Sequence, residues 1–173
     1  MKKYDSHMHG TDFCRIIEKR IRKNARLNKL FRKSDKILVK DDISEHFVKK
    51  ITKDMPVSIV KSGKADKIVE SWTADDEINN FFMNILGYGE KQDKNKVKIF
   101  LGVTDDELEE YCRLNGISFR RREKDKEIKK LIDSVTVKHP DSRHKAIKSI
   151  ERLQCLWRNL EHNNKRKAEI DKG

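Results

Sequence analysis

The chain has 173 residues and a formal net charge of +12, with 35% hydrophobic and 40% charged residues. This length suits one compact domain, with or without a helical extension, and the regular recurrence of aliphatic residues excludes a wholly disordered chain. No apolar run approaches the roughly 18 residues of a membrane span, and MKKYD lacks the apolar region of a signal peptide, so we expect no membrane contact.

The first half of the chain alternates helical and extended patterns. Apolar residues at three- and four-residue steps predict an amphipathic helix over 13–33, and KILVK (36–40) follows as a short buried strand. A short helix is expected around 47–51. VSIVK (57–61) and DKIVES (66–71) are predicted to be two more strands.

The second half begins with a capped helix. Thr73 with Asp76 three residues later is a capping pattern, and it predicts a helix over 74–86. VKIFL (97–101) reads as a strand, and Thr104 with Glu107 repeats the capping pattern before another helix. Two closing helices are predicted over 123–136 and 141–161.

Strands that alternate with helices indicate an α/β fold: a small, mostly parallel sheet flanked by helices, with N- and C-terminal helices. We expect a disordered N-terminus (1–12), an α/β domain (13–120), a C-terminal helical extension (121–161) and a disordered tail (162–173). Six residues on the apolar helix stripes are predicted to be buried: Phe81, Phe82, Ile85, Ile147, Ile150 and Trp157.

The positive charge is concentrated in two segments. Residues 15–40 hold 11 Lys and Arg against 2 acids (+9), residues 113–173 hold 18 against 9 (+9), and residues 70–112 hold 4 against 11 (−7). Basic segments of this kind suit a phosphate-rich partner, because each neutralised phosphate releases counterions. The alternative is that they only keep the protein in solution. The candidate RNA contacts are Arg20, Arg22, Lys23 and Arg26, with Arg120, Arg121 and Arg122 as a second cluster.

The three cysteines, Cys14, Cys112 and Cys155, are isolated. None belongs to a Cys-x-x-Cys pair or has a histidine at ligand spacing, so we predict no metal site. Scattered thiols in odd number fit a reducing compartment, and we expect a cytoplasmic protein.

Asp75 and Asp76 follow a predicted strand and begin a predicted helix. Ligands of open α/β sheets bind at the carboxyl ends of strands, where paired carboxylates can hold Mg²⁺ or orient a nucleotide. Acids in a first helical turn are also favoured by the helix dipole alone, at about 0.3–1 kcal/mol each. Local patterns leave both interpretations open.

The stretch GKADKIVESWTADDEINNFFMNILGYG resembles a segment of the tRNA 2-thiolation enzymes of the PP-loop (N-type ATP pyrophosphatase) superfamily. That segment runs from a strand through Gly-His-Asn-x-Asp-Asp-Glu to a helix ending in Asn-x-x-x-Gly, and Asp75, Asp76, Glu77 and Asn84 match it in place. The similarity extends over roughly residues 13–40 and 63–153. It implies a PP-loop-type fold, tRNA as partner, and ATP with Mg²⁺ as cofactors.

Most of the family's chemical residues are missing. After the first strand the family would have Ser-Gly-Gly-x-Asp-Ser, which cradles pyrophosphate, but this chain reads KDDISE. A second candidate loop keeps only Ser62, Gly63 and Asp66. Trp72 and Thr73 replace the His and Asn of the acidic turn, and the Cys-x-x-Cys pairs are absent.

Three functions follow from these observations. The first is a degenerate PP-loop protein that binds tRNA or other RNA, does not adenylate alone, and assists an active thiolation enzyme or forms a homo-oligomer. The second is an active enzyme that uses Asp75 and Asp76 for Mg²⁺–ATP. The third is an unrelated basic nucleic-acid-binding module.

Overall fold

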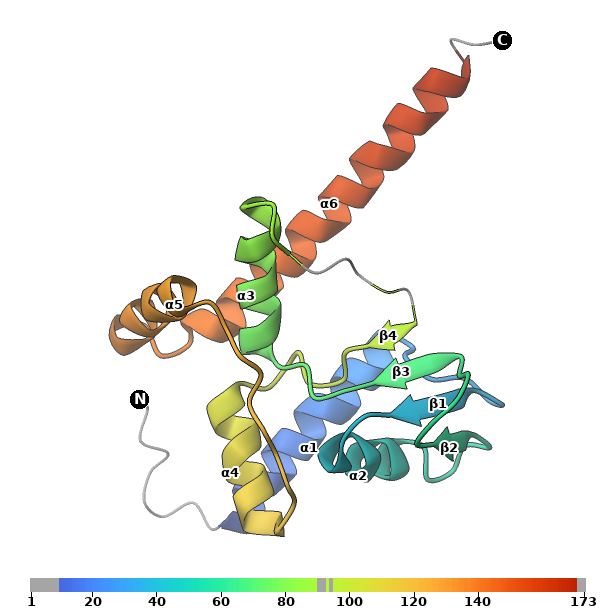
Figure 1. The fold of residues 1–173 in the computed structure, drawn as a ribbon, viewed down its shortest axis with the longest axis vertical. Coiled ribbons are helices and arrows are strands. Elements are labelled where there is room, and N and C mark those ends of the chain that lie inside the picture. The colour runs from blue at the N-terminus through green and yellow to red at the C-terminus, as the bar shows by residue number, and fades with distance from the viewer. Residues whose placement is uncertain (1–9, 90–92, 94, 171–173) are drawn as a thin grey trace.

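The computed structural model describes residues 10–89, 93 and 95–170, with the backbone alone described for 158–170. Helices and strands alternate through the first two thirds of the chain, except that β3 follows β2 directly, and two helices close it (Figure 1). The elements are α1 (Gly10–Leu27), β1 (Lys36–Val39), α2 (Asp42–Ile51), β2 (Ser58–Val60), β3 (Lys67–Val69), α3 (Ala74–Ile85), β4 (Lys96–Val97), α4 (Asp105–Asn115), α5 (Lys126–Lys138) and α6 (Ser142–Ile170).

The four strands form one sheet in the order β2-β1-β3-β4, and all neighbouring strands are parallel. Leu38 of β1 is in register with Val60 of β2 and Ile68 of β3, which places β1 and β3 at the centre. The predicted α/β fold with a parallel sheet is therefore confirmed.

The connections that leave the two central strands, β1 and β3, lead to opposite edges of the sheet. From β1 the chain passes through α2 to β2 on one side, and from β3 it passes through α3 to β4 on the other. The crevice beyond the carboxyl ends of β1 and β3 is thus the topological switch point, where ligands of open parallel sheets bind. A link of only six residues, 61–66, joins β2 to β3.

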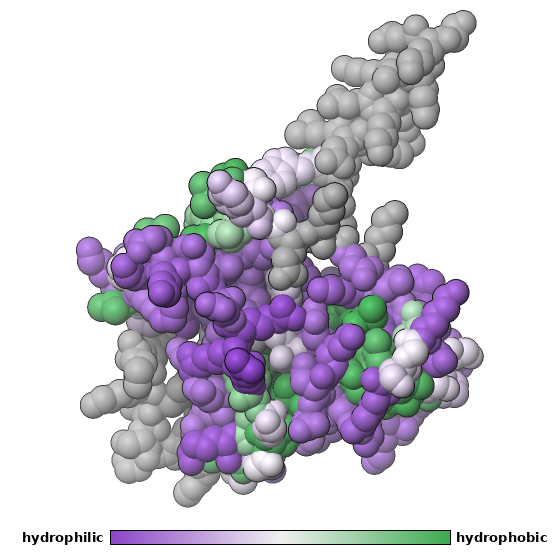
Figure 2. All heavy atoms as spheres, viewed as in Figure 1, coloured by the Kyte–Doolittle hydropathy of each residue, from purple (hydrophilic) through white to green (hydrophobic). Residues whose placement is uncertain are grey.

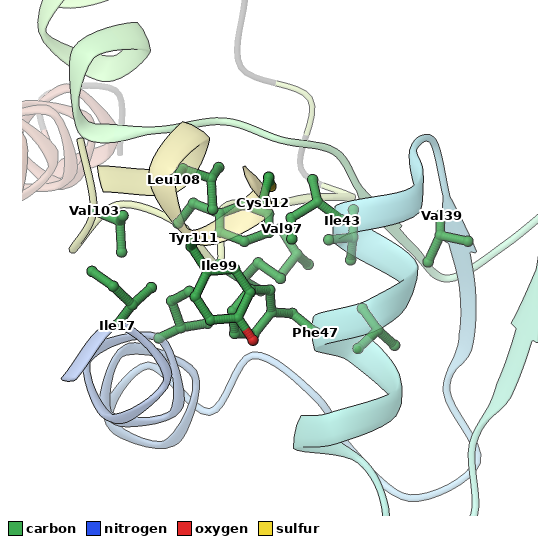
Figure 3. Close-up of a cluster of buried hydrophobic side chains, with 14 of the residues drawn as sticks. Ile17, Val39, Ile43, Phe47, Val97, Ile99, Val103, Leu108, Tyr111 and Cys112 are labelled. Atoms are coloured by element: carbon green, nitrogen blue, oxygen red, sulfur yellow. The ribbon is translucent and has the colours of Figure 1, made fainter. Parts of the chain in front are cut away.

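The main core lies between one face of the sheet and helices α1, α2 and α4. Phe47 of α2 is at its centre and packs edge-on against Phe100, with ring centroids 5.5 Å apart, and next to Tyr111 of α4 (Figure 3). Ile17 of α1 and Ile37 of β1 are fully buried in the same cluster. These contacts fix the sheet relative to α1 and α4.

A second, smaller cluster joins α3 to α6. Ile147 and Ile150 are buried there, as predicted, and Phe81 and Phe82 pack partly buried against them. The prediction was wrong for Ile85 and Trp157, which are 59% and 47% exposed. Their stripes continue past the part of each helix that the partner covers, and α6 projects well beyond α3 (Figure 1).

Two elements end elsewhere than predicted. Strand β4 stops at Val97, because the carbonyls of Lys98 and Ile99 accept hydrogen bonds from the Asn24 side chain instead of from a strand. Helix α6 continues to Ile170, nine residues past the expected end at 161, through a run of Lys, Arg, Ala and Glu that favours helix. The expected disorder of 1–9 and 171–173 lies outside the described residues, and the domain boundaries stay a prediction.

None of the helices in the described part of the chain is both long enough and apolar enough to cross a membrane. On the face shown in Figure 2 most of the surface is hydrophilic, and hydrophobic side chains gather in several separate patches, one of them over the strands.

Candidate functional site

The acidic turn lies at the carboxyl end of β3, as the sequence predicted. Thr73 is the N-cap of α3: the Asp76 amide donates to Thr73 Oγ1 (3.4 Å), and the Thr73 amide donates to Asp76 Oδ2 (2.8 Å). The predicted capping box is therefore confirmed, and Asp75 and Asp76 occupy the first turn of the helix.

A second acidic helix start lies directly beside the first. Thr73 bridges to Phe100, which brings the start of α4 against the start of α3. The Thr73 hydroxyl then donates to Asp105 Oδ1 (2.6 Å), and the Asp105 amide donates to Asp75 Oδ2 (2.7 Å). Two acidic turns that are separated by 28 residues of sequence thus form one carboxylate cluster.

Two basic side chains from the last third of the chain neutralise this cluster. Lys124 Nζ lies 2.7 Å from Asp76 Oδ1 and 2.6 Å from Asp105 Oδ2. Arg143 of α6 places Nε 3.1 Å from Asp75 Oδ1, while its Nη2 reaches Asp133 (2.6 Å) and its Nη1 reaches Asp106 (3.2 Å). Asp105, Lys124 and Arg143 were not among the predicted site residues.

The cluster is enclosed. Asp75 is only 5% exposed, and the Lys124 side chain only 9%. Burial raises the pKa of Asp75 and of Asp76 despite their cationic neighbours. Burial also opposes the charged form of Lys124, but hydrogen bonds to Asp105 and Asp76 outweigh it and raise the pKa of this lysine. Asp75, Asp76, Asp105 and Lys124 thus form a largely buried ion-pair network, and Asp75 and Asp105 line a small pocket of about 180 Å³ beside it.

The glutamate of the acidic turn, Glu77, is also held by groups of the protein. It is buried, and its Oε2 accepts from Trp72 Nε1 (2.8 Å) and from Lys98 Nζ (2.5 Å). Gln154 of α6 donates to its other oxygen (3.1 Å). Trp72 therefore donates a hydrogen bond to a carboxylate, and the centroid of its ring lies 4.6 Å from the Lys98 ammonium.

The turn after β1, where the resemblance would place a phosphate cradle, is occupied by a side chain of the protein. Asp41 is the N-cap of α2, and its Oδ1 accepts from the Ser44 amide (2.8 Å). Its Oδ2 accepts from the Ser71 amide beyond β3 (2.8 Å). The Asp41 carboxylate thus accepts a hydrogen bond from the start of α2, where free amides would otherwise attract an external anion.

The second candidate loop lies elsewhere. Ser62 and Gly63 are exposed in the link between β2 and β3, and Gly63 has the positive φ of 90° that glycine tolerates. Asp66 lies at the amino edge of the sheet, where its carboxylate accepts from the Lys36 amide (2.9 Å). The structure does not bring these residues to Asp75 and Asp76.

A pocket of about 540 Å³ opens at the switch point between β1 and β3. Arg120, Arg121 and Arg122 line it, together with Lys40. Arg122 pairs with Glu70 (2.7 Å), and Arg121 pairs with Asp106 (2.9 Å), so two cations of this triplet are neutralised inside the protein. Arg120 has no ion pair among the described residues.

The four predicted RNA contacts of α1 lie on two faces of the helix. Arg22 Nη2 lies 3.5 Å from Glu18 Oε2. Arg26 follows Arg22 one helical turn later. Arg20 and Lys23 point instead to a pocket between α1 and α6, where Arg20 donates to Glu107 (2.7 Å). The structure therefore divides this cluster between two surfaces.

The lowered pKa of Glu107 predicts how the free energy of unfolding depends on pH. Burial alone would raise its pKa, but the side chain of His144, the Thr104 amide and Arg20 lower the pKa to about 2, against a usual 4.5. The ionised Glu107 side chain therefore contributes fully to the free energy of unfolding above pH 4.5, and this contribution is lost as the pH falls toward 2. We expect that loss to be on the order of 3 kcal/mol.

Urea unfolding of the wild type and of Glu107→Gln, followed at several pH values between neutral and acid, checks this expectation. The unfolding free energy of the variant should vary less across the acid range than that of the wild type. Parallel curves for the two proteins would contradict the assignment.

No family model and no curated protein matches the sequence. Among solved structures, the fold is similar to that of the U34-tRNA thiolase NcsA from Methanococcus maripaludis, determined with its [4Fe-4S] cluster. The TM-score is 0.58 at 12% sequence identity, and the match covers 83% of this chain and 79% of that one. The two chains share a fold. At this identity the comparison concerns the fold alone.

The cysteines of this chain do not fit an iron–sulfur cluster. Such clusters are held by several cysteine thiolates. Cys14, Cys112 and Cys155 lie on α1, α4 and α6, and the described residues contain no group of three or more Cys, His, Asp or Glu able to hold a metal ion. Burial raises the pKa of Cys112 to about 12, which disfavours the thiolate that a metal requires.

Proposed function

We propose that this chain is a degenerate PP-loop protein related to the tRNA-thiolation enzymes, which binds tRNA or another RNA and does not activate it alone. The similar solved structure is a tRNA thiolase, which makes tRNA the first RNA to test. The proposal rests on the state of the acid pair and on the basic surfaces.

The observation that carries the loss of chemistry is the pairing of Asp75 and Asp76 with Arg143 and Lys124. A carboxylate that holds Mg²⁺ must turn an oxygen toward the ion and the nucleotide. Here both cations that neutralise the pair come from the protein, and the network is buried. The residues present therefore do not fit Mg²⁺–ATP at the acid pair, and Asp41 disfavours a polyphosphate after β1 for the same electrostatic reason.

RNA binding is supported by the net charge and by where it lies. Three exposed cations have no ion pair among the described residues: Lys23, Arg26 and Arg120. Their charges therefore face solvent and are not neutralised by the protein. Such charges attract a polyanion and make its binding depend on salt.

We propose that the protein assists a thiolation enzyme, or acts as a homo-oligomer, in the cytoplasm, where three free cysteines remain reduced.

The test has two independent arms. In the first, labelled tRNA is titrated with the protein at low and at moderate salt, and we expect an affinity that falls steeply with salt. In the second, pyrophosphate release from Mg²⁺–ATP is measured with and without tRNA, and we expect none. Pyrophosphate release that Asp75→Asn abolishes would overturn the proposal in favour of an active enzyme.

A second candidate is supported by the pocket of about 540 Å³ at the switch point, because its size suits a nucleotide and Arg120 lines it without an ion pair among the described residues. Its wall also carries three acids: Asp41, Glu70 and Glu123. Under this alternative the chain is an active Mg²⁺–ATP-dependent tRNA-modifying enzyme. Calorimetric titration of ATP with and without Mg²⁺, on the wild type and on Arg120→Gln, separates it from the first proposal.

A further inference from the structure

A groove runs along one side of the molecule between the two ends of the sequence. It consists of two adjoining pockets of about 600 Å³ and 470 Å³, which share Asn24, Asn28, Leu101 and Glu151 as wall residues. We call this the α1–α6 groove. Helix α1 and the segment after it form one wall, α6 forms the other, and β4 with the residues after it forms the floor.

The groove collects basic side chains from both basic segments of the sequence. Lys23 of α1 and Lys148 of α6 line the same pocket, although 125 residues separate them. Among the described lining residues there are eight lysines and arginines against three acids: Arg20, Lys23, Lys29, Arg32, Lys67, Lys96, Lys98 and Lys148 against Glu77, Asp93 and Glu151.

Most of these cations are not neutralised by the protein. Arg20, Lys96 and Lys98 pair with Glu107, Glu70 and Glu77. The other five have no ion pair among the described residues: Lys23, Lys29, Arg32, Lys67 and Lys148. This contrasts with the acid pair, where every charge is matched, and marks the groove as the place where an external anion is attracted.

We propose that the α1–α6 groove binds a single-stranded segment of RNA. The proposal rests on the proposed RNA-binding function and names the site and the form of RNA. Lysines of both walls contact the phosphates, and the bases lie toward the floor.

The shape and the polar walls favour unpaired nucleotides over a duplex. A pocket of about 600 Å³ has the size of sites for small molecules, enough for one or two nucleotides and too small for a helix of paired strands. Asn28 is exposed on its wall, where it donates to Asn24 Oδ1 (2.7 Å) and presents an amide of the type that pairs with base edges. Bases are available for such contacts where the strand is unpaired.

The probe is a fluorescein-labelled oligouridine RNA of about 12 nucleotides, within the site sizes of single-strand binders, and a duplex of the same length. Binding is followed by fluorescence anisotropy over a series of salt concentrations. The double variant Lys23→Gln, Lys148→Gln should weaken binding and lower the slope of log K against log salt by about 0.7 for each lost phosphate contact. Glu151→Gln removes an acid from the shared wall and should strengthen binding.

The matched control is Lys53→Gln, Lys64→Gln, which removes the same charge from exposed positions next to β2, at the other edge of the sheet. It should leave the affinity within about twofold of the wild type, and glutamine keeps the helical propensity of lysine at 23 and 148.

Three results would overturn the groove assignment: equal losses in the control and the groove variants, tighter binding of the duplex, or weaker binding by Glu151→Gln. If the wild type binds neither tRNA nor the oligonucleotide, the proposed function itself fails. If it binds tRNA but the groove variants bind equally well, only the groove assignment fails.

Discussion

Replacing Lys124 with methionine is expected to lower the free energy of unfolding by about 3–5 kcal/mol. The substitution keeps much of the side-chain volume but removes the charge that lies 2.7 Å from Asp76 and 2.6 Å from Asp105. Two buried carboxylates would then lack their shared cation, and an uncompensated buried charge is among the most costly defects in a fold. Urea unfolding at neutral pH measures the loss.

Lys126→Met serves as the matched control, because Lys126 is exposed two residues away and has no ion pair among the described residues. It should change the free energy of unfolding by less than about 0.5 kcal/mol. Adding Asp76→Asn to Lys124→Met should recover part of the loss, since it removes one of the unpaired charges. A cost for Lys124→Met that equals the cost of the control would show that solvent reaches the cluster.

Truncating Phe47 to alanine is expected to cost about 3–5 kcal/mol, because its ring is 1% exposed at the centre of the main core. Phe81→Ala should cost less, about 1–2 kcal/mol, since Phe81 is only partly buried and stacks on the half-exposed Trp157. Chemical denaturation of both variants gives the comparison. Tyr88→Ala, at one of the most exposed aromatic side chains, provides the baseline. Equal losses at Phe47 and Phe81 would mean that α6 covers α3 more fully than the structure indicates.

The acidic turn shows what a local pattern can predict. The spacing of Thr73 and Asp76 predicted a capping box, a helix start and a place at the carboxyl end of a strand, because all three depend on residues close in sequence. The partners of the acids could not be predicted in this way. Lys124 and Arg143 lie 48 and 68 residues further along than Asp76 and Asp75, in segments with many similar cations. The one available signal was that three consecutive acids before an apolar helix stripe require compensation if they are buried.

The apolar stripes show a different limit. Periodicity predicted the inward faces of α3 and α6 and was right at Ile147 and Ile150. It was wrong at Ile85 and Trp157 because a stripe reports which face is apolar, and the length of the covering element decides where burial ends. Likewise, a strand was predicted over 97–101, but β4 ends at Val97. The next two carbonyls accept hydrogen bonds from Asn24, a residue more than 70 positions earlier in the sequence.

The late position of Lys124 and Arg143 in the sequence has a consequence for biosynthesis. The sheet, α3 and α4 are complete once residue 115 has left the ribosome, but at that moment Asp75, Asp76 and Asp105 still lack their cations. Enclosing these carboxylates without a counter-charge is unfavourable, so the nascent chain must leave the carboxyl edge of its sheet open to water. The edge closes only after Arg143 has emerged, so the docking of α6 belongs to the late steps of co-translational folding.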